Sequence, residues 1–391
     1  MARPKIALFS HDIGGNSMYR TLLLYRALQP SYDVEIVGFD KGRGLWGPVR
    51  SERLSLRSEP LSGWGSLARS SYRLLAPLEA DLVIASKARL PSFGLALVNR
   101  LFRGTPVILD VDDDERAMTR PPETVKARTI LAYNLRNPDA YFSALAMHRM
   151  ARSADHVFCV SEFFRSLYGG SIVPHGLKPH EYYVASESVD SLRSELGIHE
   201  AFVVVFVGTP RPHKGIAETL EAARRSGIDG IRVVVVGTAK GDSYVENLAA
   251  EYPDILVPVS SQPSERIPYY LALGDVTVIA QKDSPESHGQ MPAKLTDAML
   301  AGLPIIATSI SDIPKYLTGC GILIERADPD LIAQGLRWVF EHPEEAKSFG
   351  LAARNVALEK LTDKAISKTM QAAISAVMQK RRASRRPAEK A

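Results

Sequence analysis

Short apolar runs rich in β-branched residues alternate with helical patterns along the whole chain. The first half contains five such runs, at Lys5–Phe9, Val34–Val37, Asp81–Ala85, Pro106–Asp110 and His156–Val160. The second half contains six, at Phe202–Val207, Arg232–Val236, Ile255–Val259, Val276–Ala280, Pro304–Ala307 and Ile322–Ile324. Strands that alternate with helices form parallel βαβ units, with helices on both faces of the sheet. The pattern predicts an α/β protein with two doubly wound, Rossmann-like domains.

The two sets of predicted strands are separated by a polar stretch, which we interpret as a linker. The predicted N-terminal domain comprises residues 1–176, this linker residues 177–200 and the C-terminal domain residues 201–360. A crossover helix at 361–380 and a basic tail at 381–391 follow. In the crossover helix, apolar residues recur at helical spacing, at Ile366, Met370, Ile374 and Val377. Such an apolar face needs a partner surface, so we expect the helix to pack back across the interdomain region.

Composition favours a soluble globular protein in a reducing compartment. The chain has 391 residues, 45% of them hydrophobic, and lacks the run of about 18 apolar residues that a membrane helix needs. The N-terminus enters a strand at once, without the pattern of a signal peptide, which favours a cytoplasmic location. Cys159 and Cys320 lie in apolar contexts without metal-ligand spacing, so two buried thiols are expected.

The net charge of +4 is concentrated at the C-terminus. Residues 380–391 hold six Lys and Arg residues and one Glu, so the rest of the chain is close to neutral. A nucleic-acid-binding protein normally carries its basic surface on the folded domain, so this class is disfavoured. The tail is either a solvated terminus or a weak peripheral contact with the inner face of an anionic membrane.

The loop after the first predicted strand, residues 10–17, contains the glycine pair Gly14-Gly15 and precedes a helix near Met18. Adjacent glycines let a ligand approach the backbone, and a helix N-terminus attracts anions. The spacing differs from G-x-G-x-x-G, so a dinucleotide is not favoured. The loop is either a tight turn or part of a ligand site.

A second loop, in the sequence VGTPRPHKG, places Gly208 after a strand and then Arg211 and Lys214 before a helix. Two cations three residues apart at the carboxyl end of a strand suit a diphosphate. Arginine offers a planar fork and lysine a mobile point charge. The alternative is a pair of solvated loop charges.

The segment 286–306 contains a predicted helix with an anion-binding start. Pro292 is placed as a first-turn proline, and Gly302 follows the predicted last residue. Lys294 lies in the first turn, and Asp297 could accept hydrogen bonds from ribose hydroxyls. The candidate residues for binding here are Gly289, Gln290, Met291, Pro292, Lys294 and Asp297. With Arg211 and Lys214, they favour a diphosphate clamp.

An acidic run, Asp110-Val111-Asp112-Asp113-Asp114-Glu115, follows a strand of the first half. Clustered carboxylates repel, so the run indicates a catalytic role, bonding to hydroxyls or helix N–H groups, or a Mg²⁺ site. We rank the metal last, because the cations of the second half could already neutralise a diphosphate. A solvated acidic loop is the alternative to all three.

These segments together resemble the retaining glycosyltransferases of the GT-B fold, specifically family 4. VGTPRPHKG matches the family's strand-G-x-x-x-x-x-K-G element, and DAMLAGLPIIAT resembles its E-A-M-A-x-G-x-P-V-I-A-T signature. Upstream, VSEFFRSLY and IVPHGL resemble the family's strand-helix and interdomain entry. The resemblance is specific over about residues 200–360 and looser over 1–176. It implies a donor-nucleotide C-terminal domain and an acceptor-side N-terminal domain.

Two departures from the family pattern affect the predicted catalytic residues. The usual pair of Glu residues with seven between them is replaced here by Asp297 and Gly289, and Glu286 is the nearest candidate for the first Glu. Many members carry a His where this chain has Asp112-Asp113. The resemblance therefore implies catalytic roles for Asp112, Asp113, Arg211, Lys214 and Glu286, and donor contacts from Gly14, Gly15, Gly208 and the residues at 289–297.

The implied activity is that of a hexosyltransferase-type, metal-independent enzyme. It would move a sugar from a nucleoside-diphosphate sugar, its substrate and not a cofactor, to a hydroxyl with retention. Cations around the leaving diphosphate would be its main catalytic device. Asp112, Asp113 or His11 would orient the sugar or the acceptor. The alternatives are a sugar-nucleotide epimerase of the same architecture and a non-catalytic partner subunit that kept the fold.

Overall fold

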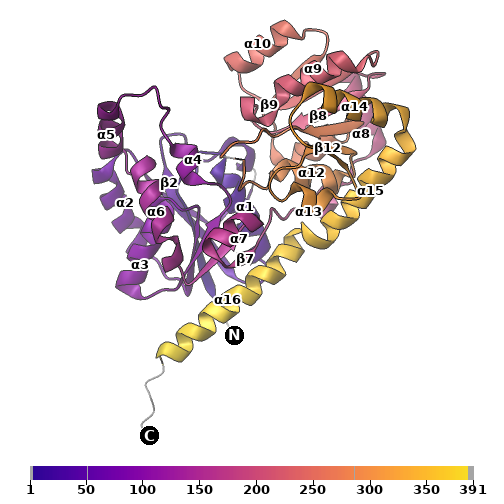
Figure 1. Cartoon of the computed structure of the whole chain (residues 1–391). Coiled ribbons are helices and arrows are strands. Elements are labelled where there is room, and N and C mark those ends of the chain that lie inside the picture. The colour runs from indigo at the N-terminus through magenta and orange to yellow at the C-terminus, as the bar shows by residue number, and fades with distance from the viewer. Residues whose placement is uncertain (1–2, 51, 286, 386–391) are drawn as a thin grey trace. The chain divides into compact units, whose positions relative to one another are not determined.

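The computed structural model describes residues 3–50, 52–285 and 287–385, which form two compact units (Figure 1). Unit 1 combines residues 1–176 with the C-terminal segment from Asp363, and unit 2 runs from Leu177 to Thr362. Each unit has its own parallel sheet and its own hydrophobic core. The predicted fold class, two doubly wound Rossmann-like domains, is confirmed.

Within the described residues, unit 1 has a seven-stranded sheet of order β3-β2-β1-β4-β5-β6-β7. The strands are β1 (Lys5–Ser10), β2 (Asp33–Asp40), β3 (Leu56–Pro60), β4 (Leu82–Ser86), β5 (Val107–Val111), β6 (His156–Cys159) and β7 (Ser171–Ile172). In the centre, Leu8 lies beside Ile36 on one side and Ile84 on the other, and all three are fully buried. Near-continuous apolar strands are required where helices cover both faces.

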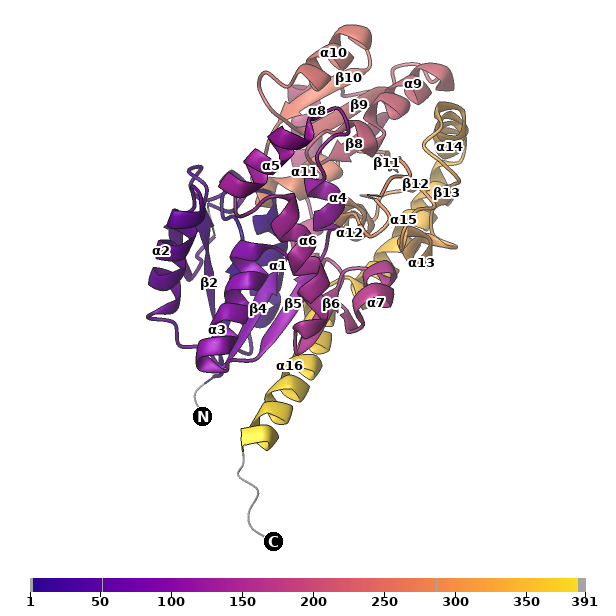
Figure 2. The same cartoon turned by 60° about the vertical axis from the view of Figure 1, so that its left-hand side comes forward.

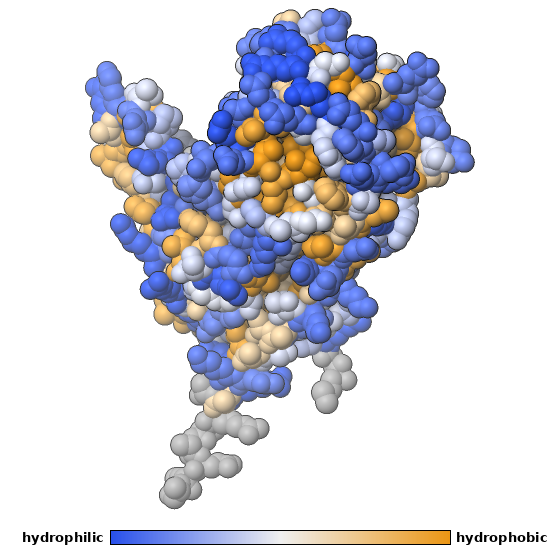
Figure 3. Space-filling model, turned by 45° about the vertical axis from the view of Figure 1, so that its right-hand side comes forward, coloured by the Kyte–Doolittle hydropathy of each residue, from blue (hydrophilic) through white to orange (hydrophobic). Residues whose placement is uncertain are grey.

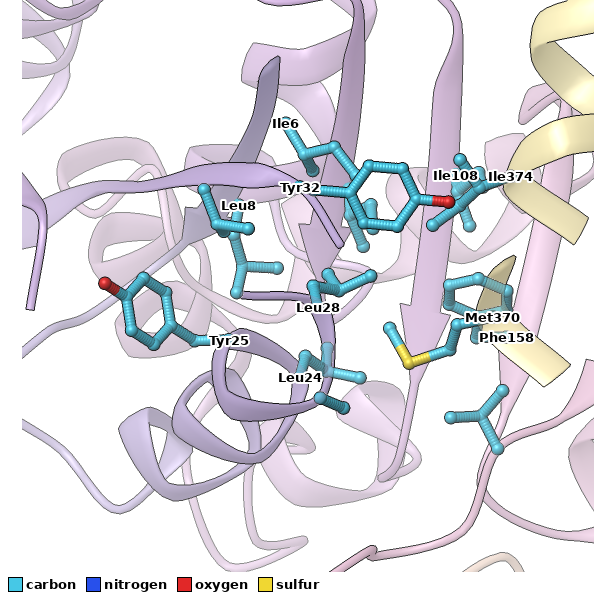
Figure 4. Packing of buried hydrophobic residues seen from close by; sticks show 14 of the residues in the cluster. Ile6, Leu8, Leu24, Tyr25, Leu28, Tyr32, Ile108, Phe158, Met370 and Ile374 are labelled. Carbon is cyan, nitrogen blue, oxygen red and sulfur yellow. The ribbon is translucent and has the colours of Figure 1, made fainter. Parts of the chain in front are cut away.

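The helices of unit 1 are α1 (Ser17–Leu28), α2 (Trp64–Leu75), α3 (Leu95–Arg103), α4 (Glu115–Thr119), α5 (Ala127–Arg136), α6 (Tyr141–Met150), α7 (Glu162–Tyr168) and α16 (Asp363–Arg385), with short turns η1 (Gly47–Val49), η2 (Leu90–Gly94) and η3 (Ala151–Ser153). Helices α1 and α16 share a core over one face of the sheet. Figure 4 shows Met370 and Ile374 of α16 beside Ile108 and Phe158 of the sheet. The connections that contain α2, α3 and α4–α6 run toward the edge of the sheet opposite to the one toward which the α1 connection runs. Because such connections are right-handed, these helices lie on the opposite face from α1.

Unit 2 has, within the described residues, a six-stranded parallel sheet of order β10-β9-β8-β11-β12-β13. The strands are β8 (Val203–Val207), β9 (Arg232–Thr238), β10 (Leu256–Ser260), β11 (Val276–Ile279), β12 (Ile305–Thr308) and β13 (Ile322–Ile324). The helices are α8 (Ser186–Glu195), α9 (Ile216–Ser226), α10 (Ser243–Glu251), α11 (Ile267–Leu271), α12 (Ala293–Ala301), α13 (Ile313–Leu317), α14 (Pro329–Glu341) and α15 (Pro343–Lys360), with turns η4 (Pro179–Tyr182), η5 (Pro212–Lys214) and η6 (Ser264–Arg266).

Strand β9 shows why this sheet needs helices on both faces. Val233 and Val235 belong to one core cluster with residues of α9 and α14, whereas Val234 and Val236 belong to a second cluster with residues of α8 and α11. Successive residues of a strand point to opposite faces, so four consecutive valines fill both cores. The unbroken apolar run is thereby explained.

The structure differs from the prediction at two edge strands and at the linker. Strands β3 and β7 lack apolar runs and were not predicted, because the edge strands of a sheet bury less surface. The predicted linker 177–200 belongs to unit 2, since Leu192 of α8 and Ile198 enter its core. A single apolar stripe suffices to hold α8 on unit 2. The polar residues around this stripe led to the prediction of a linker.

The C-terminal helix α16 packs on unit 1, where Ser367 Oγ donates to the carbonyl of Ala27 at 2.7 Å. It continues to Arg385, so residues 381–385 of the predicted tail are helical, in keeping with the helix propensity of Arg and Ala. Residues 386–391 lie outside the described part of the chain. Among the described helices, none has both the length and the apolar character needed to cross a membrane.

Candidate functional site

The sheet order of unit 2 places the loop after β8 beside the loop after β11. These strands are neighbours, and the chain continues from them toward opposite edges of the sheet. Lys282 donates its backbone N–H to the carbonyl of His213 at 2.9 Å, which ties the two loops together. Ligands of open α/β sheets bind at such a switch point, beyond the carboxyl ends of the strands. The described parts of the predicted elements, residues 208–215 and 287–297, therefore meet at one place.

Two glycines shape the loop after β8. Gly208 has a φ of +128° and Gly215 a φ of +71°, both in the region that favours glycine. A Cβ at Gly215 would lie 2.0 Å from the carbonyl oxygen of Ala280, directly after β11. Gly215 thus permits the close approach of the two loops.

Arg211 and Lys214 lie on this loop with weak attachments. The Arg211 side chain is half exposed, donates to the carbonyl of Pro210 at 3.0 Å, and lies 3.8 Å from Asp242 Oδ2. Lys214 Nζ donates to the carbonyl of Thr209 at 2.7 Å. Both side chains can turn toward an anionic ligand without leaving a buried carboxylate unpaired.

Lys294, in the first turn of α12, has an unusual environment for a lysine. Its Nζ is shielded from solvent and, among the described residues, has no hydrogen-bond partner. It lies 4.5 Å from the centre of the Phe206 ring. Burial, and secondarily the positive charge of Lys214, lower the pKa of Lys294 well below its usual value. A buried cation next to another cation is destabilising unless an anion joins them.

The start of α12 lies at the same place. The helix begins at Ala293, one residue after Pro292, and ends at Gly302 with a φ of +73°, as predicted for a helix-ending glycine. The first turn of α12 has no acidic residue and no side-chain cap. Its N–H groups are therefore suited to an anion.

The residues just before α12 differ in how they can contribute. Gln290 accepts a hydrogen bond from the buried Gln281 at 3.1 Å, which fixes its side chain. The Met291 side chain is buried, so only its backbone could face a ligand. Gly289 lies in the same turn. Glu286, the predicted first Glu of the family pattern, lies outside the described residues.

Asp297 lies one turn further along α12 and is almost completely buried. Its Oδ1 accepts a hydrogen bond from the Tyr182 hydroxyl of η4. Burial raises the pKa of Asp297 to about 7, although the Tyr182 hydroxyl opposes the shift. The carboxyl group can therefore change its charge near neutral pH.

In unit 1, the glycine pair after β1 is explained by local packing. A Cβ at Gly14 would lie 2.7 Å from the carbonyl oxygen of Gly44, and a Cβ at Gly15 would lie 3.1 Å from Asp12 Oδ2. Asp12 accepts from the Gly14 N–H at 2.9 Å and pairs with Arg43. The loop is a tight turn held by Asp12, and helix α1 follows at Ser17.

Most of the acidic run of unit 1 surrounds one buried cation, Lys87. Lys87 Nζ lies 2.8 Å from Asp112 Oδ1 and 3.1 Å from Glu115 Oε1, and it also pairs with Asp113. Lys87 adopts a φ of +72°, which is uncommon for a residue with a side chain. Burial alone would lower the pKa of Lys87, but the three carboxylates raise it well above its usual value.

The remaining acids of the run also have partners. Asp110 pairs with the fully buried Arg20 at 2.6 Å, and Asp114 accepts from two N–H groups at the start of α4. The alternative of a solvated acidic loop is therefore wrong, because Arg20 of α1 and Lys87 after β4 neutralise most of the run. Within the described residues, no group of three or more His, Cys, Asp and Glu side chains could hold a metal ion.

A second group of charges extends this network toward His11. Asp139 binds Arg89 at 2.6 Å and also pairs with Lys41. Burial lowers the pKa of His11 well below its usual value, although Asp139 opposes this. Burial also raises the pKa of Asp112 to about 7, against the influence of Lys87. Unit 1 thus holds a neutral imidazole and a titratable carboxyl group in one charged cluster.

Comparison with known proteins identifies both halves of the chain. Residues 18–176 match a glycosyl transferase 4-like domain, and residues 188–356 match the glycosyl transferases group 1. The chain thus combines two domains of glycosyltransferase families.

Two curated relatives are similar to parts of this glycosyltransferase. TuaH of Bacillus subtilis, assigned to teichuronic acid biosynthesis, is 25% identical over 175 residues, or 43% of each chain. The D-rhamnosyltransferase WbpZ of Pseudomonas aeruginosa is 22% identical over 211 residues, or 52% of this chain and 53% of its own. The chain thus aligns with about half the length of these relatives.

Solved structures show the same fold over nearly the whole chain. Anabaena HepE, in complex with UDP and glucose, superimposes with a TM-score of 0.75 at 16% identity, over 96% of this chain and 100% of its own. Sucrose-phosphate synthase of Thermosynechococcus elongatus gives 0.74 at 17% identity, over 97% and 100%. The architecture of the glycosyltransferase is therefore that of GT-B enzymes.

Several residues of the two sites escaped the sequence prediction. Tyr182 lies in the segment expected to be a linker. Lys87, Arg89 and Asp139 lie outside the glycine-rich loops and the acidic run from which the sites were predicted. Lysines and arginines in a polar segment look like surface residues, so their burial gave no signal. The position of Lys87 shortly after a predicted strand is the signal that could have been used.

Proposed function

We propose that the chain transfers a sugar from a nucleoside-diphosphate sugar to an acceptor hydroxyl, with retention and without a metal ion. The observation that carries this proposal is Lys294 at the start of α12, whose Nζ is shielded from solvent and has no hydrogen-bond partner among the described residues. A diphosphate would supply the missing negative charge. Arg211 and the N–H groups of α12 would complete the clamp.

The clamp would act mainly on the leaving group. As the bond between the anomeric carbon and the diphosphate oxygen breaks, negative charge grows on the diphosphate, and preorganised cations stabilise it. The acceptor oxygen forms its bond on the same face of the sugar, and its proton passes to the leaving phosphate. No covalent enzyme intermediate is needed.

The remaining candidate residues receive roles around this reaction. Asp297 would accept hydrogen bonds from the ribose hydroxyls, and the uncharged His11 or Asp112 and Asp113 would orient the sugar or the acceptor. Because HepE was solved with UDP, UDP-linked sugars are the first donors to test. The basic segment 380–391 stays a predicted weak contact with a membrane surface.

The double variant Arg211→Ala/Lys214→Ala tests the proposal. We expect it to fold normally, because neither side chain is buried, and to lose sugar transfer. The variant Lys347→Ala/Lys360→Ala, which removes two exposed lysines of α15, should retain activity. Wild-type transfer rates in the first variant would refute the clamp.

Incubation with the donor alone separates transfer from its alternatives. An isomerised sugar nucleotide would indicate an epimerase. Binding of the donor without transfer to any acceptor would indicate a non-catalytic subunit. Transfer or slow donor hydrolysis, with release of the nucleoside diphosphate, is the result that we expect.

A further inference from the structure

Besides the largely buried helix α1, four helices of unit 1 contain no acidic residue. In α2, α3, α5 and α6 the charged residues are seven arginines, Arg69, Arg73, Arg100, Arg103, Arg128, Arg136 and Arg149. The exposed helices of soluble proteins normally carry charges of both signs. Outside residues 380–391 the chain as a whole, these helices included, is close to neutral, so this accumulation of positive charge is local.

The same four helices expose large apolar side chains. Within the described residues, these helices have ten exposed large apolar side chains: Trp64, Tyr72, Val98, Leu101, Phe102, Leu131, Tyr133, Leu135, Phe142 and Met150. Leu101 and Phe102, at the end of α3, are each 80% exposed. Single exposed apolar residues are ordinary, but a group of this size on neighbouring helices marks an interaction surface.

The helices adjoin one another in unit 1, and Arg103 at the end of α3 donates to the carbonyl of Leu75 at the end of α2 at 2.8 Å. Helices α3 and α6 both pack on η2, and α5 packs on α6. Figure 2 shows α3, α6 and α5 following one another along unit 1, with α2 nearby. In Figure 3, hydrophobic and hydrophilic residues lie side by side on the visible part of unit 1. We call the surface of α2, α3, α5 and α6 the basic apolar face.

We propose that the basic apolar face docks on an anionic phospholipid membrane. Charge complementarity selects this occupant. Arg69, Arg128, Arg136 and Arg149 form no ion pair among the described residues, whereas Arg73 and Arg100 lie near Glu59 and Asp155. Arginines that are free of carboxylates can bind lipid phosphates, while adjacent Leu, Phe and Trp side chains enter the interfacial layer.

A nucleic acid fits this face less well than a membrane does. Phosphate groups would satisfy the arginines, but the aliphatic side chains of Leu101, Leu131 and Leu135 would have no stacking partner. A membrane interface takes up both kinds of side chain at once. The inference is independent of the proposed reaction, because it uses no residue of the diphosphate clamp or of the charged cluster around Lys87.

Co-sedimentation of the full chain with lipid vesicles tests the proposal. We expect binding to vesicles of phosphatidylcholine mixed with phosphatidylglycerol, weak binding to phosphatidylcholine alone, and weakening by salt. The variant Arg128→Gln/Arg136→Gln should weaken binding about fivefold for each arginine removed. Leu101→Ser/Phe102→Ser should weaken it about tenfold or more. All four side chains are exposed, so circular dichroism and donor binding should not change.

Matched control variants test whether a loss of vesicle binding belongs to the basic apolar face. Phe340→Ser/Leu351→Ser removes exposed apolar residues of unit 2, and Lys347→Gln/Lys360→Gln removes charges there; both should bind vesicles like the wild type. If only Lys380→Gln/Arg381→Gln/Arg382→Gln lost binding, the contact would belong to the C-terminal segment and the proposal would be wrong. Vesicle binding unchanged in the α3 and α5 variants, self-association through this face, or a preference for RNA would also overturn it.

Discussion

Two buried lysines of this chain have opposite electrostatic environments. Lys87 is surrounded by three carboxylates of its own unit, which hold its pKa above the usual value. Lys294 faces an aromatic ring and a second lysine, and its pKa is lowered. A charge that already has partners stabilises the fold, whereas a charge without one is suited to a ligand. We therefore assign a structural role to Lys87 and a binding role to Lys294.

The variant Lys294→Met tests that assignment. Because the lowered pKa means that folding disfavours the charged form, methionine should leave the stability of unit 2 equal or higher in the absence of ligand. Stabilisation of unit 2 by a nucleoside diphosphate should largely disappear. Thermal melts with and without UDP measure both effects, and Lys347→Met, which removes an exposed lysine of α15, should show no stability gain.

A second prediction at the residue scale concerns Asp297. Its pKa in the folded state, about 7, is above the ordinary value of 3.8, so the folded state holds the proton more tightly. The stability contributed by this group is complete below about pH 4 and is lost as the pH rises to about 7. The loss is on the order of a few kcal/mol.

Unfolding of unit 2 in urea at about pH 5 and about pH 8 measures this loss. Asp297→Asn should flatten the dependence on pH. Tyr182→Phe removes a hydrogen bond that lowers the pKa of Asp297, so it should move the dependence to higher pH. An unchanged profile in Asp297→Asn would show that other groups cause it.

At the scale of elements, the site of unit 2 depends on the close contact between the loops after β8 and β11, which Gly215 permits. We predict that Gly215→Ala destabilises unit 2 by about 2–3 kcal/mol or more, from the positive φ and from the contact with Ala280. Gly227→Ala is the matched control, because Gly227 has the same φ of +71° with nothing within 4 Å of a Cβ.

Nucleotide binding separates the two glycine variants further. The change at position 215 must displace the loop that carries Arg211 and Lys214, so UDP binding should weaken. The change at position 227 should leave UDP binding intact, at a stability loss of about 1 kcal/mol. Equal effects of both variants on stability and binding would argue against close loop contact.

At the scale of the whole molecule, the last helix completes the first unit. Met370 of α16 is fully buried in the core of unit 1, although more than half of the chain separates it from its neighbours there. Met370→Ala should destabilise unit 1 by about 2–5 kcal/mol. Calorimetry with UDP should then show a lowered transition for unit 1 and an unchanged, ligand-stabilised transition for unit 2. Met378→Ala, at a half-buried position of the same helix, should have a much smaller effect.

The sequence by itself determined most of the strands, the parallel topology and the loops that carry glycine, arginine and lysine. These features depend on short-range rules: alternation of apolar residues, the need for positive φ, and the position of a loop after a strand. For the same reason, Arg211, Lys214 and Lys294 could be singled out before their positions in space were known.

Only the tertiary structure decided which charges have partners. Tyr182 and Asp297 lie 115 residues apart, and Arg20 meets Asp110 across 90 residues, yet each pair forms one buried contact. The energy of a charge depends on its burial and on the groups within a few ångströms. Those neighbours come from distant segments, so the acidic run appeared repulsive in the sequence and is neutralised in the folded chain.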